Sequence, residues 1–456
     1  MTDPHTPQTT AADPSPTTGL HHQGWWGEVA RVLAPLAWVA FGGPQAHLAL
    51  LHDHIVEKRR WVDSKAFTEL FAVCSMLPGP SSTQTVIGLG IIRAGLAGGI
   101  AALLVWIAPA ISIMIALALS TRMFNADQLD AYLVGVRPAV VGVVAVAGWK
   151  IGRRVVTDPF TFAAMVFGAA VTIWKPAPYT FPAVLLAAGL AALAIPRKPG
   201  TRPADAEPMT DDSSTHPDSE RVITVSISRT TGIAALTLFA VLLVSLITAA
   251  AVVNEQAADR TRLAEPVRVS ECFYRNSSFI FGGGQVLLPL LQTDCVVRNQ
   301  WVTPEQFGNG LGVMQASPGP LFSFSGYIGA MIPRTQRSVD EPPPSPLTQI
   351  AYGLLASGSI FLPALLLLIG IMPFWSTLRR YRSVKQALTG VNASAVGLVV
   401  AAVWLLGRDY LHSAMDAGLA VMVCLALGLT ARLPVPAVMV AAGVVGYGIR
   451  AAGLSA

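Results

Sequence analysis

Phe41-Gly42-Gly43-Pro44-Gln45 and, further along the chain, Pro78-Gly79-Pro80 decide the fold, because the sequence contains both motifs twice. The second copy reads Phe281-Gly282-Gly283-Gly284-Gln285 and Pro318-Gly319-Pro320. Each motif lies 240 positions after its equivalent, with no insertion or deletion between the two. Because an internal repeat fixes the architecture of a chain, the sequence predicts two homologous halves.

The composition is that of a membrane protein. Of the 456 residues, 53% are hydrophobic and only 12% are charged, whereas soluble domains carry about 25% charged residues. Apolar runs of about 20 residues recur, which is the length that crosses a hydrocarbon core of about 30 Å. These runs are continuous rather than alternating, so helices are favoured over barrel strands. We predict an all-α polytopic protein of the plasma membrane, surrounded by the lipid bilayer.

The apolar runs form two sets of six around one isolated run. The predicted segments are a disordered tail (1–28), a first half (29–196), a polar disordered linker (197–230), a connecting transmembrane helix (231–254) and a second half (265–453). The total is about thirteen transmembrane helices. Because an odd number of crossings separates the starts of the two halves, the halves enter from opposite faces. This is the inverted repeat of many secondary transporters.

The second half contains an extra loop at residues 333–346. Beyond it the spacing between equivalent residues grows, so that Gly135-Val136 matches Gly390-Val391 at an offset of 255.

The two motifs suit the binding of a small oxyanion. Pro-Gly-Pro inside an apolar run prevents an unbroken helix, and such a break is tolerated in a membrane where it is buried in protein or lines a wet cavity. Ser81-Ser82-Thr83-Gln84 then offers capping side chains at the start of a new half-helix, whose free amides favour an anion. The second copy restarts with fewer hydroxyl groups, so the first copy is the better cradle.

From this reasoning we assign substrate binding to residues of both motif pairs: Gly42, Gly43, Pro44, Gln45, Pro78, Gly79, Pro80, Ser81, Ser82, Gln84, Gly282, Gly283, Gly284, Gln285, Pro318, Gly319 and Pro320. The alternative is that Gly and Pro only permit close packing or kinks of the helices. Two copies in register favour the binding site.

Five charged residues are candidates for attracting the anion or coupling its transport: Arg59, Arg60, Glu69, Arg93 and Arg137. An arginine at membrane depth is a functional candidate, although each of these could instead extend its charge to the interface.

No enzyme, cofactor, metal or nucleic-acid function is indicated. His47, His52, Asp53 and His54 are close in sequence, but their spacing fits no standard zinc site. The motifs of hydrolases and nucleotide-binding loops are missing from the sequence. The net charge of +5 is explained by basic residues between the apolar runs.

The repeated segments resemble the chromate ion transporter superfamily. The residues that carry the resemblance are the first motif with Ala46-His47, Trp61-Val62, Leu77-Pro78-Gly79-Pro80 and Gln84, and in the second half Gln285-Val286 and Gln315-Ala316-Ser317-Pro318-Gly319-Pro320. The resemblance adds Gln315 to the substrate-binding residues. It implies two fused, oppositely oriented halves and transport of chromate, commonly as efflux that confers resistance, with sulfate as a related oxyanion.

The sequence therefore predicts a secondary transporter of chromate, or of sulfate or a related oxyanion, that works by alternating access around a site between the two halves. An anion channel of the same architecture is one alternative, and a membrane scaffold or regulator without transport is another. A coupled proton or counter-anion as driving ion, and the oligomeric state, are left open.

Overall fold

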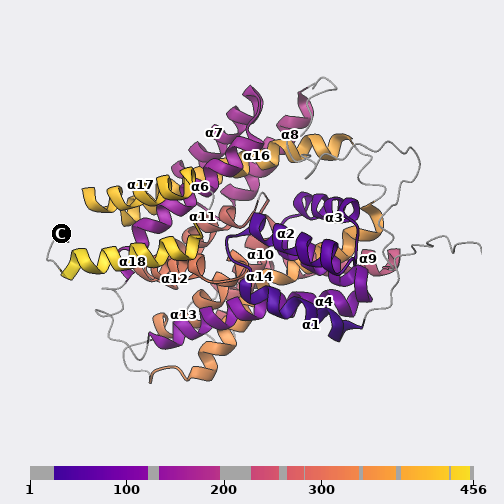
Figure 1. The fold of residues 1–456 in the computed structure, drawn as a ribbon, viewed down its shortest axis with the longest axis horizontal. Coiled ribbons are helices and arrows are strands. Elements are labelled where there is room, and N and C mark those ends of the chain that lie inside the picture. The colour runs from indigo at the N-terminus through magenta and orange to yellow at the C-terminus, as the bar shows by residue number, and fades with distance from the viewer. Residues whose placement is uncertain are drawn as a thin grey trace, which may run out of the picture.

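The computed structural model describes residues 25–121, 133–195, 227–255, 264–281, 283–337, 342–375, 382–430 and 433–451. Within these ranges the chain is helical and has no strand (Figure 1). Four helices of this part of the chain are long and apolar enough to cross a membrane. The prediction of an all-α, integral, multi-pass membrane protein is confirmed. Most of the predicted tail (residues 1–24) and of the predicted linker (residues 197–226) lies outside the described residues.

The two halves contain the same succession of helices. The first half consists of α1 (Trp26–Val39), α2 (Pro44–Leu51), the π-helix η1 (His52–Lys58), α3 (Ser64–Met76), α4 (Ser81–Ser120), α6 (Val136–Val155), α7 (Pro159–Trp174) and α8 (Thr180–Ala194). The connecting helix is α9 (Arg229–Glu255). The second half consists of α10 (Ala264–Ser278), η2 (Gly284–Val286), α11 (Leu287–Leu291), the π-helix η3 (Gln292–Arg298), α12 (Pro304–Ala316), η4 (Leu321–Ser323), α13 (Phe324–Thr335), α14 (Pro346–Ile371), η5 (Met372–Phe374), α16 (Arg382–Tyr410), α17 (Ala414–Leu429) and α18 (Val435–Ala451).

Local structure repeats as well as helix order. The two π-helices, η1 and η3, lie 240 positions apart. The residues in the turns after them, Arg60 (φ 51°) and Gln300 (φ 52°), share a left-handed backbone. Beyond the inserted loop, α7 and α17 both begin with a capping box, at an offset of 255. Equivalent sequences therefore adopt equivalent local structures.

Helix α4 is bent back on itself. Its backbone leaves the helical region at Ala94 (φ −140°) and Gly95 (φ 64°), and Gly90 packs directly against Gly98 across the break. The limbs on either side of the break are therefore antiparallel. The second half has α13 and α14 here, joined by the inserted loop, which accounts for the change of offset.

Each Pro-Gly-Pro motif is the tip of a helical hairpin. Leu70 of α3 packs on Gly88 of α4, and both lie nine residues from Gly79. Gly310 of α12 packs on Tyr327 of α13 in the same way around the second tip. A helix of 13 residues, such as α3, spans only about 20 Å. Each hairpin therefore enters the molecule to about half the thickness of a membrane and returns.

Each Phe-Gly-Gly motif is the tip of a second hairpin. The outer end of α1 meets the outer end of the first limb of α4, because Arg93 forms an ion pair with Glu28 at 3.0 Å. Trp61, in the turn after η1, lies under the same Arg93 guanidinium. The start of α1 and the end of η1 thus share one face. The count of about thirteen crossings took each broken run as one crossing, whereas each folds as a pair of half-helices.

The two halves are inverted, as predicted. The second limb of α4 crosses the molecule and ends beside α13, where Arg334 donates to Thr121. In the opposite direction α14 and η5 end beside α3, where Trp375 Nε1 donates to Glu69 Oε1 at 2.9 Å. The hairpins of the first half therefore enter from one face and those of the second half from the other.

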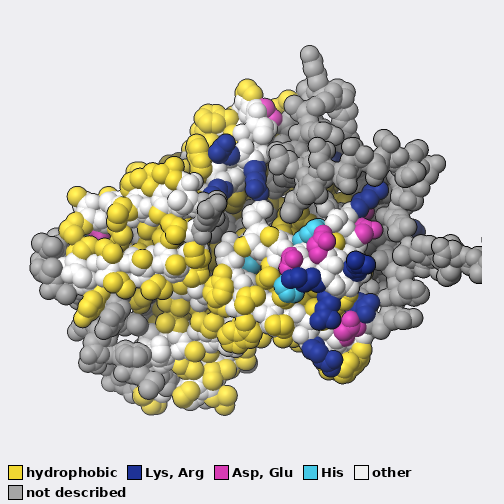
Figure 2. All heavy atoms as spheres, viewed as in Figure 1, with side chains coloured by type: hydrophobic (Ala, Val, Ile, Leu, Met, Phe, Trp, Pro, Cys, Tyr) yellow, Lys and Arg dark blue, Asp and Glu magenta, His cyan; other side chains and the backbone are white. Residues whose placement is uncertain are grey.

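The remaining helices form a separate layer, in which α16 packs against α6, α7 and α8, and α17 packs on α6. In Figure 1 this layer lies at the upper left of the hairpins. Hydrophobic side chains cover its surface over α17 and α18, while charged and histidine side chains gather over the outer ends of the first-half hairpins (Figure 2). Exposed apolar residues such as Trp174 and Leu429 fit a lipid-facing layer.

Substitution of Gly319 by Ala should destabilise the protein by about 1–3 kcal/mol, because φ there is +106° and a Cβ would lie 2.7 Å from Ala110 Cβ. The matched control is Gly418→Ala on α17, where a Cβ would meet nothing within 4 Å. Thermal unfolding of the detergent-solubilised protein measures both. Equal midpoints for Gly319→Ala and wild type would contradict the packing described for this tip.

Candidate functional site

The four hairpin tips meet at the centre of the molecule and are joined by two equivalent backbone hydrogen bonds. Gly79 N–H donates to Ile280 O at 2.8 Å, and Gly319 N–H donates to Ala40 O at 2.8 Å. The two bonds exchange places under the 240-residue offset of the repeat. The Pro-Gly-Pro tip of each half thus pairs with the Phe-Gly-Gly tip of the other.

Glycine is required in the Pro-Gly-Pro tips for both conformation and space. Gly79 has φ +114° and Gly319 has φ +106°, values that side-chain-bearing residues rarely adopt. A Cβ on Gly79 would lie 3.0 Å from Ala364 Cβ of α14, in the other half. The equivalent contact for Gly319 is with Ala110 of α4. Each tip is therefore seated on the crossing helix of the opposite half.

The carbonyl groups and the amide groups at the centre are not satisfied to the same extent. Ala40 O and Ile280 O, at the inner ends of α1 and α10, accept the two crossing bonds. Pro78 O accepts from Gln84 Nε2 at 2.9 Å. These three carbonyl groups are thus occupied.

The amide ends of the outgoing half-helices are open. In α4 the first intrahelical bond is from Gln84 N–H to Pro80 O, so the amides of residues 81–83 precede the ladder, and no side chain caps this helix. The helix starts at Pro44, Gly284 and Leu321 also lack a side-chain cap. Amides without partners at helix starts attract anions.

Polar side chains with open hydrogen-bonding capacity surround these starts. Thr83 Oγ1 and Gln84 Oε1 in the first copy are buried and have no hydrogen-bond partner among the described residues. In the second copy the same holds for Ser323 Oγ, Gln285 Oε1 and Gln315 Nε2. Buried polar atoms in this state are costly unless a water or a ligand satisfies them. The centre is therefore neutral and buried: the helix-start amides, the Thr83 and Ser323 hydroxyl groups and Gln315 Nε2 are open donors, while Gln84 Oε1 and Gln285 Oε1 are open acceptors.

The structure brings most of the predicted binding residues together. Pro78, Gly79, Pro80, Ser81, Ser82 and Gln84 form the first Pro-Gly-Pro tip and helix start, and Pro318, Gly319 and Pro320 form the second tip. Gly42, Gly43, Pro44 and Gln45, and likewise Gly283, Gly284 and Gln285, form the facing tips. Gly282 lies outside the described residues.

The charged candidates lie away from the centre. Arg59 and Arg60 are exposed in the turn after η1. Arg93 is at the outer end of the first limb of α4 with Glu28. Glu69 accepts from Trp375, and Arg137 Nε donates to Asn309 Oδ1 at 2.9 Å. None of these contacts is with a tip, so they give no support to a direct role of these residues in binding the anion.

Three residues at the centre were not among the assigned binding residues, although Thr83 belongs to the predicted capping run. Thr83 and Ser323 are equivalent at the 240-residue offset, and both are fully buried. Comparing the two restarts position by position would have singled them out as the first hydroxyl pair that both copies keep. His47, also buried, was considered as a metal ligand and as part of the family resemblance, but was not assigned to the site. No group of three or more potential metal-ligating His, Cys, Asp or Glu side chains occurs in the described ranges.

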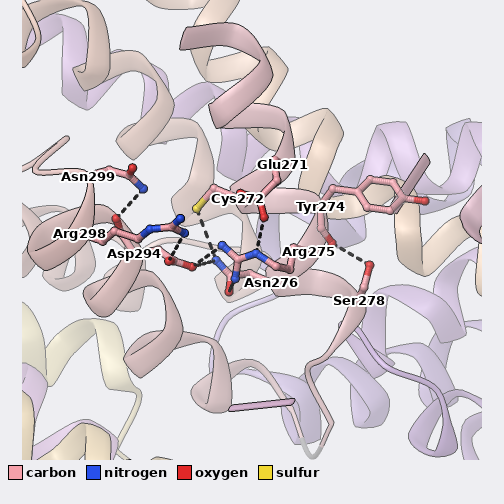
Figure 3. A network of polar contacts seen from close by, with 9 residues as sticks. All are labelled: Glu271, Cys272, Tyr274, Arg275, Asn276, Ser278, Asp294, Arg298 and Asn299. Carbon is pink, nitrogen blue, oxygen red and sulfur yellow. Dashed lines mark hydrogen bonds and ion pairs between the residues drawn. The ribbon is translucent and has the colours of Figure 1, made fainter. Parts of the chain in front are cut away.

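A buried charged network was also missed. Figure 3 shows Arg275 on α10 directed toward Glu271 and toward Asp294 on η3. Arg275 donates to Asp294 Oδ2 at 3.0 Å, and Asn276 Nδ2 donates to the same oxygen at 2.8 Å. Arg298 lies 3.7 Å from Asp294 Oδ1. The pairs are charge-balanced, so the network ties α10 to η3 without giving the centre a net charge.

The equivalent positions of the first half explain why repeat symmetry did not reveal this network. Pro35 and His54 stand where the second half has Arg275 and Asp294. On that side Lys58 donates to Asp53 Oδ2 at 2.7 Å, which lowers the pKa of the exposed Asp53 carboxyl. The two π-helices therefore carry different electrostatics, buried in one half and exposed in the other.

An inverted repeat of broken helices that meet at a neutral centre is an architecture of membrane transport proteins. The family model described as chromate transporter matches residues 27–193 and 267–447. The chain therefore belongs to the chromate transporter family.

Relatives with known names cover most of the chain. It is 23% identical over 423 residues to a probable chromate transport protein of Synechococcus elongatus, covering 92% of this chain and 94% of the relative. It is 26% identical over 365 residues to a chromate transport protein of Pseudomonas aeruginosa, covering 79% and 76%. It is 22% identical over 451 residues to one of Cupriavidus metallidurans, covering 98% of each. No solved structure matches the chain.

Replacement of Arg275 by Leu should destabilise the protein by about 3–5 kcal/mol, because it leaves buried carboxylates uncompensated. The matched control is Arg298→Leu, which removes an arginine that is 46% exposed beside the same Asp294 and should cost at most about 1 kcal/mol. Thermal unfolding in detergent compares the two. A loss for Arg298→Leu as large as that for Arg275→Leu would contradict the proposed difference.

Proposed function

We propose that this chain is a secondary transporter that carries chromate, or a related oxyanion such as sulfate, across the plasma membrane by alternating access between its two halves. The observation that carries the proposal is the hydrogen-bond balance at the centre, where Ala40 O, Ile280 O and Pro78 O each accept a hydrogen bond and the amides at the starts of the outgoing half-helices are open. Tetrahedral oxyanions are acceptors only, so such a centre suits them and not cations.

The family supports the choice of substrate. The relatives from Pseudomonas aeruginosa and Cupriavidus metallidurans are named chromate transport proteins. Family membership favours a transporter over an enzyme. The centre itself offers neutral donors to any oxyanion of this shape, so sulfate is the natural competitor.

Unequal packing of the two copies supports alternating access. In the second copy α12 is docked on α6 and α18. Arg137 of α6 donates to Asn309 of α12, Gly312 packs on Val136, and Tyr410 O–H donates to Pro304 O at 2.9 Å. These contacts close the face from which the second-half hairpins enter.

The first copy lacks this docking. Glu69 and Asn392 are the equivalents of Asn309 and Arg137, yet Glu69 accepts a hydrogen bond from Trp375. Asn392 Oδ1 is buried without a hydrogen-bond partner in the described part of the chain. A cavity of about 80 Å³ separates α3 from the start of α16 and is lined by residues that include Val73, Met76, Leu77, Trp375, Val384 and Leu388.

The two Phe-Gly-Gly tips also differ in exposure, and again the first copy is the more open. Gln45 and Ala46 are exposed, whereas their equivalents Gln285 and Val286 are partly and fully buried. The first copy of the repeat thus has an open arrangement, and the second copy a closed arrangement, in the same structure. An exchange of these two arrangements would open the centre to the other face, which is how inverted repeats produce alternating access. Because Thr83 and Ser323 are fully buried, a carrier is favoured over an open anion channel.

The direction that we propose is export. An inside-negative membrane potential drives a net negative charge outward. Chromate accumulation in cells that express the chain, compared with cells carrying an empty vector, tests it: lower accumulation supports export, and higher accumulation contradicts it.

Thr83→Val should weaken chromate binding by at least about tenfold, since a hydrogen bond from the hydroxyl to a charged group is worth about 1.5–3 kcal/mol. The matched control is Thr172→Val on α7, which removes another fully buried hydroxyl without a hydrogen-bond partner, far along the chain in the outer layer. Chromate-dependent flux into proteoliposomes, measured over a range of chromate concentrations, compares the two. Equal half-saturation for all three proteins would contradict the assigned centre.

Alternating access predicts a contact that this structure does not contain. Ala72 and Val391 are the equivalents of Gly312 and Val136, which pack together in the closed copy. In a variant without the native cysteines 74, 272, 295 and 424, cysteines at 72 and 391 should cross-link during transport, and the cross-link should stop chromate flux reversibly.

The single-cysteine variants at 72 and 391 are the controls for this experiment. Flux that continues at full rate after complete cross-linking, or flux without any cross-linking, would contradict the exchange of the two arrangements.

A further inference from the structure

His47 connects a hairpin tip to the start of a binding helix. It lies on α2 and is 1% exposed. Its Nε2 is 3.0 Å from Ala40 O, the carbonyl that also accepts from Gly319 N–H. Its Nδ1 is 3.3 Å from Ser82 Oγ. The second copy has Leu287 at this position, so the device belongs to the first copy alone.

The hydrogen bonds define the tautomer of the neutral ring. A carbonyl oxygen can only accept, so the hydrogen of neutral His47 is on Nε2 and points to Ala40 O. Nδ1 then has a lone pair and accepts the hydroxyl hydrogen of Ser82. While His47 is neutral, Ser82 therefore gives its hydrogen to the ring and not to a ligand at the start of α4.

Protonation reverses this bond. A second hydrogen on Nδ1 makes the ring a donor to Ser82 Oγ, and the Ser82 hydroxyl hydrogen must turn to another acceptor. The protonated ring also places one positive charge beside a helix start with open amides. Both changes favour an oxyanion at the centre.

We infer that His47 is the proton-binding group of the transporter, and that a proton on His47 and an oxyanion at the centre stabilise each other. This inference rests on the proposed function. By linkage, the bound anion raises the proton affinity of His47 by the same factor as the proton raises the affinity for the anion. The proton then travels with the anion. A dianion with one proton keeps a net negative charge, so the membrane potential still drives it outward.

The charged groups on the neighbouring helices are engaged with one another. His47 is the one ionisable residue of α2. On η1, Lys58 and His54 both contact Asp53, and His52 lies 3.8 Å from Glu57. On α4 and α1, Arg93 pairs with Glu28, and Arg31 is exposed.

None of the ion pairs of the described residues includes His47. The ring packs edge-on against Trp106, with centroids 5.4 Å apart. The anion is therefore the group that would compensate a charge on His47.

His47→Gln tests the inference, because glutamine can donate and accept but cannot take up a proton. Purified full-length protein in proteoliposomes is assayed for chromate exchange without a pH gradient, and for chromate accumulation driven by an acid exterior with the membrane potential clamped. We expect the variant to exchange chromate with a raised half-saturating concentration and to lose pH-driven accumulation about tenfold. His54→Gln, the same change at the outer end of the hairpin, should retain both.

Two results of this assay separate the inference from the proposed function. Chromate accumulation driven by the pH gradient in His47→Gln at the wild-type level would overturn the inference. Wild type that exchanges no chromate would contradict the proposed function instead.

If His47→Gln loses exchange as well, a measurement on the wild-type protein tests the inference. At alkaline pH, where chromate is fully deprotonated, chromate binding to the wild-type protein in weakly buffered detergent solution should take up protons. Chromate binding without proton uptake would overturn the inference.

Discussion

The satisfaction of backbone polar groups in broken helices is the constraint on which this structure depends. A chain that interrupts a helix inside a bilayer must find partners for the freed N–H and C=O groups, since lipid offers none. Here each half solves this problem with the other half: Gly79 N–H reaches Ile280 O, and Gly319 N–H reaches Ala40 O. The bonds join the halves and define the centre in the same step. Neither half could close its tips alone.

This pairing also decides the chemistry of the centre. Because the crossing bonds are made by carbonyl acceptors at the ends of the incoming half-helices, the open groups that remain are amides and hydroxyls such as Thr83 and Ser323. The formal charges lie elsewhere, in the balanced network of Arg275 and Asp294 and in the exposed turn after η1. A dianion would therefore be held by dipoles, with His47 as the adjacent group able to add a positive charge.

Because of the repeat, the two-half architecture could be predicted from the sequence. Two motif pairs in register predicted homologous halves, and the odd number of runs predicted their inversion, which the contacts at Thr121 and Glu69 bear out. The sequence left open whether each broken run crosses the membrane or turns back, because an apolar run shows only that a segment is buried in lipid or protein. That difference depends on long-range contacts such as Arg93 with Glu28 and Leu70 with Gly88.

The sequence by itself determined the membrane class, the halves and the residues of the tips, because hydrophobicity, proline and glycine act locally on the chain. Only the tertiary structure decided which tip pairs with which, since the two hydrogen bonds cross between halves. The tertiary structure also decided that the two copies are docked unequally. Asn309 is bound to Arg137, while Asn392 Oδ1 has no hydrogen-bond partner among the described residues. The sequence shows that Glu69 and Asn392 replace Asn309 and Arg137 in the first copy, but not which copy is docked, because docking depends on how the helices are arranged in space.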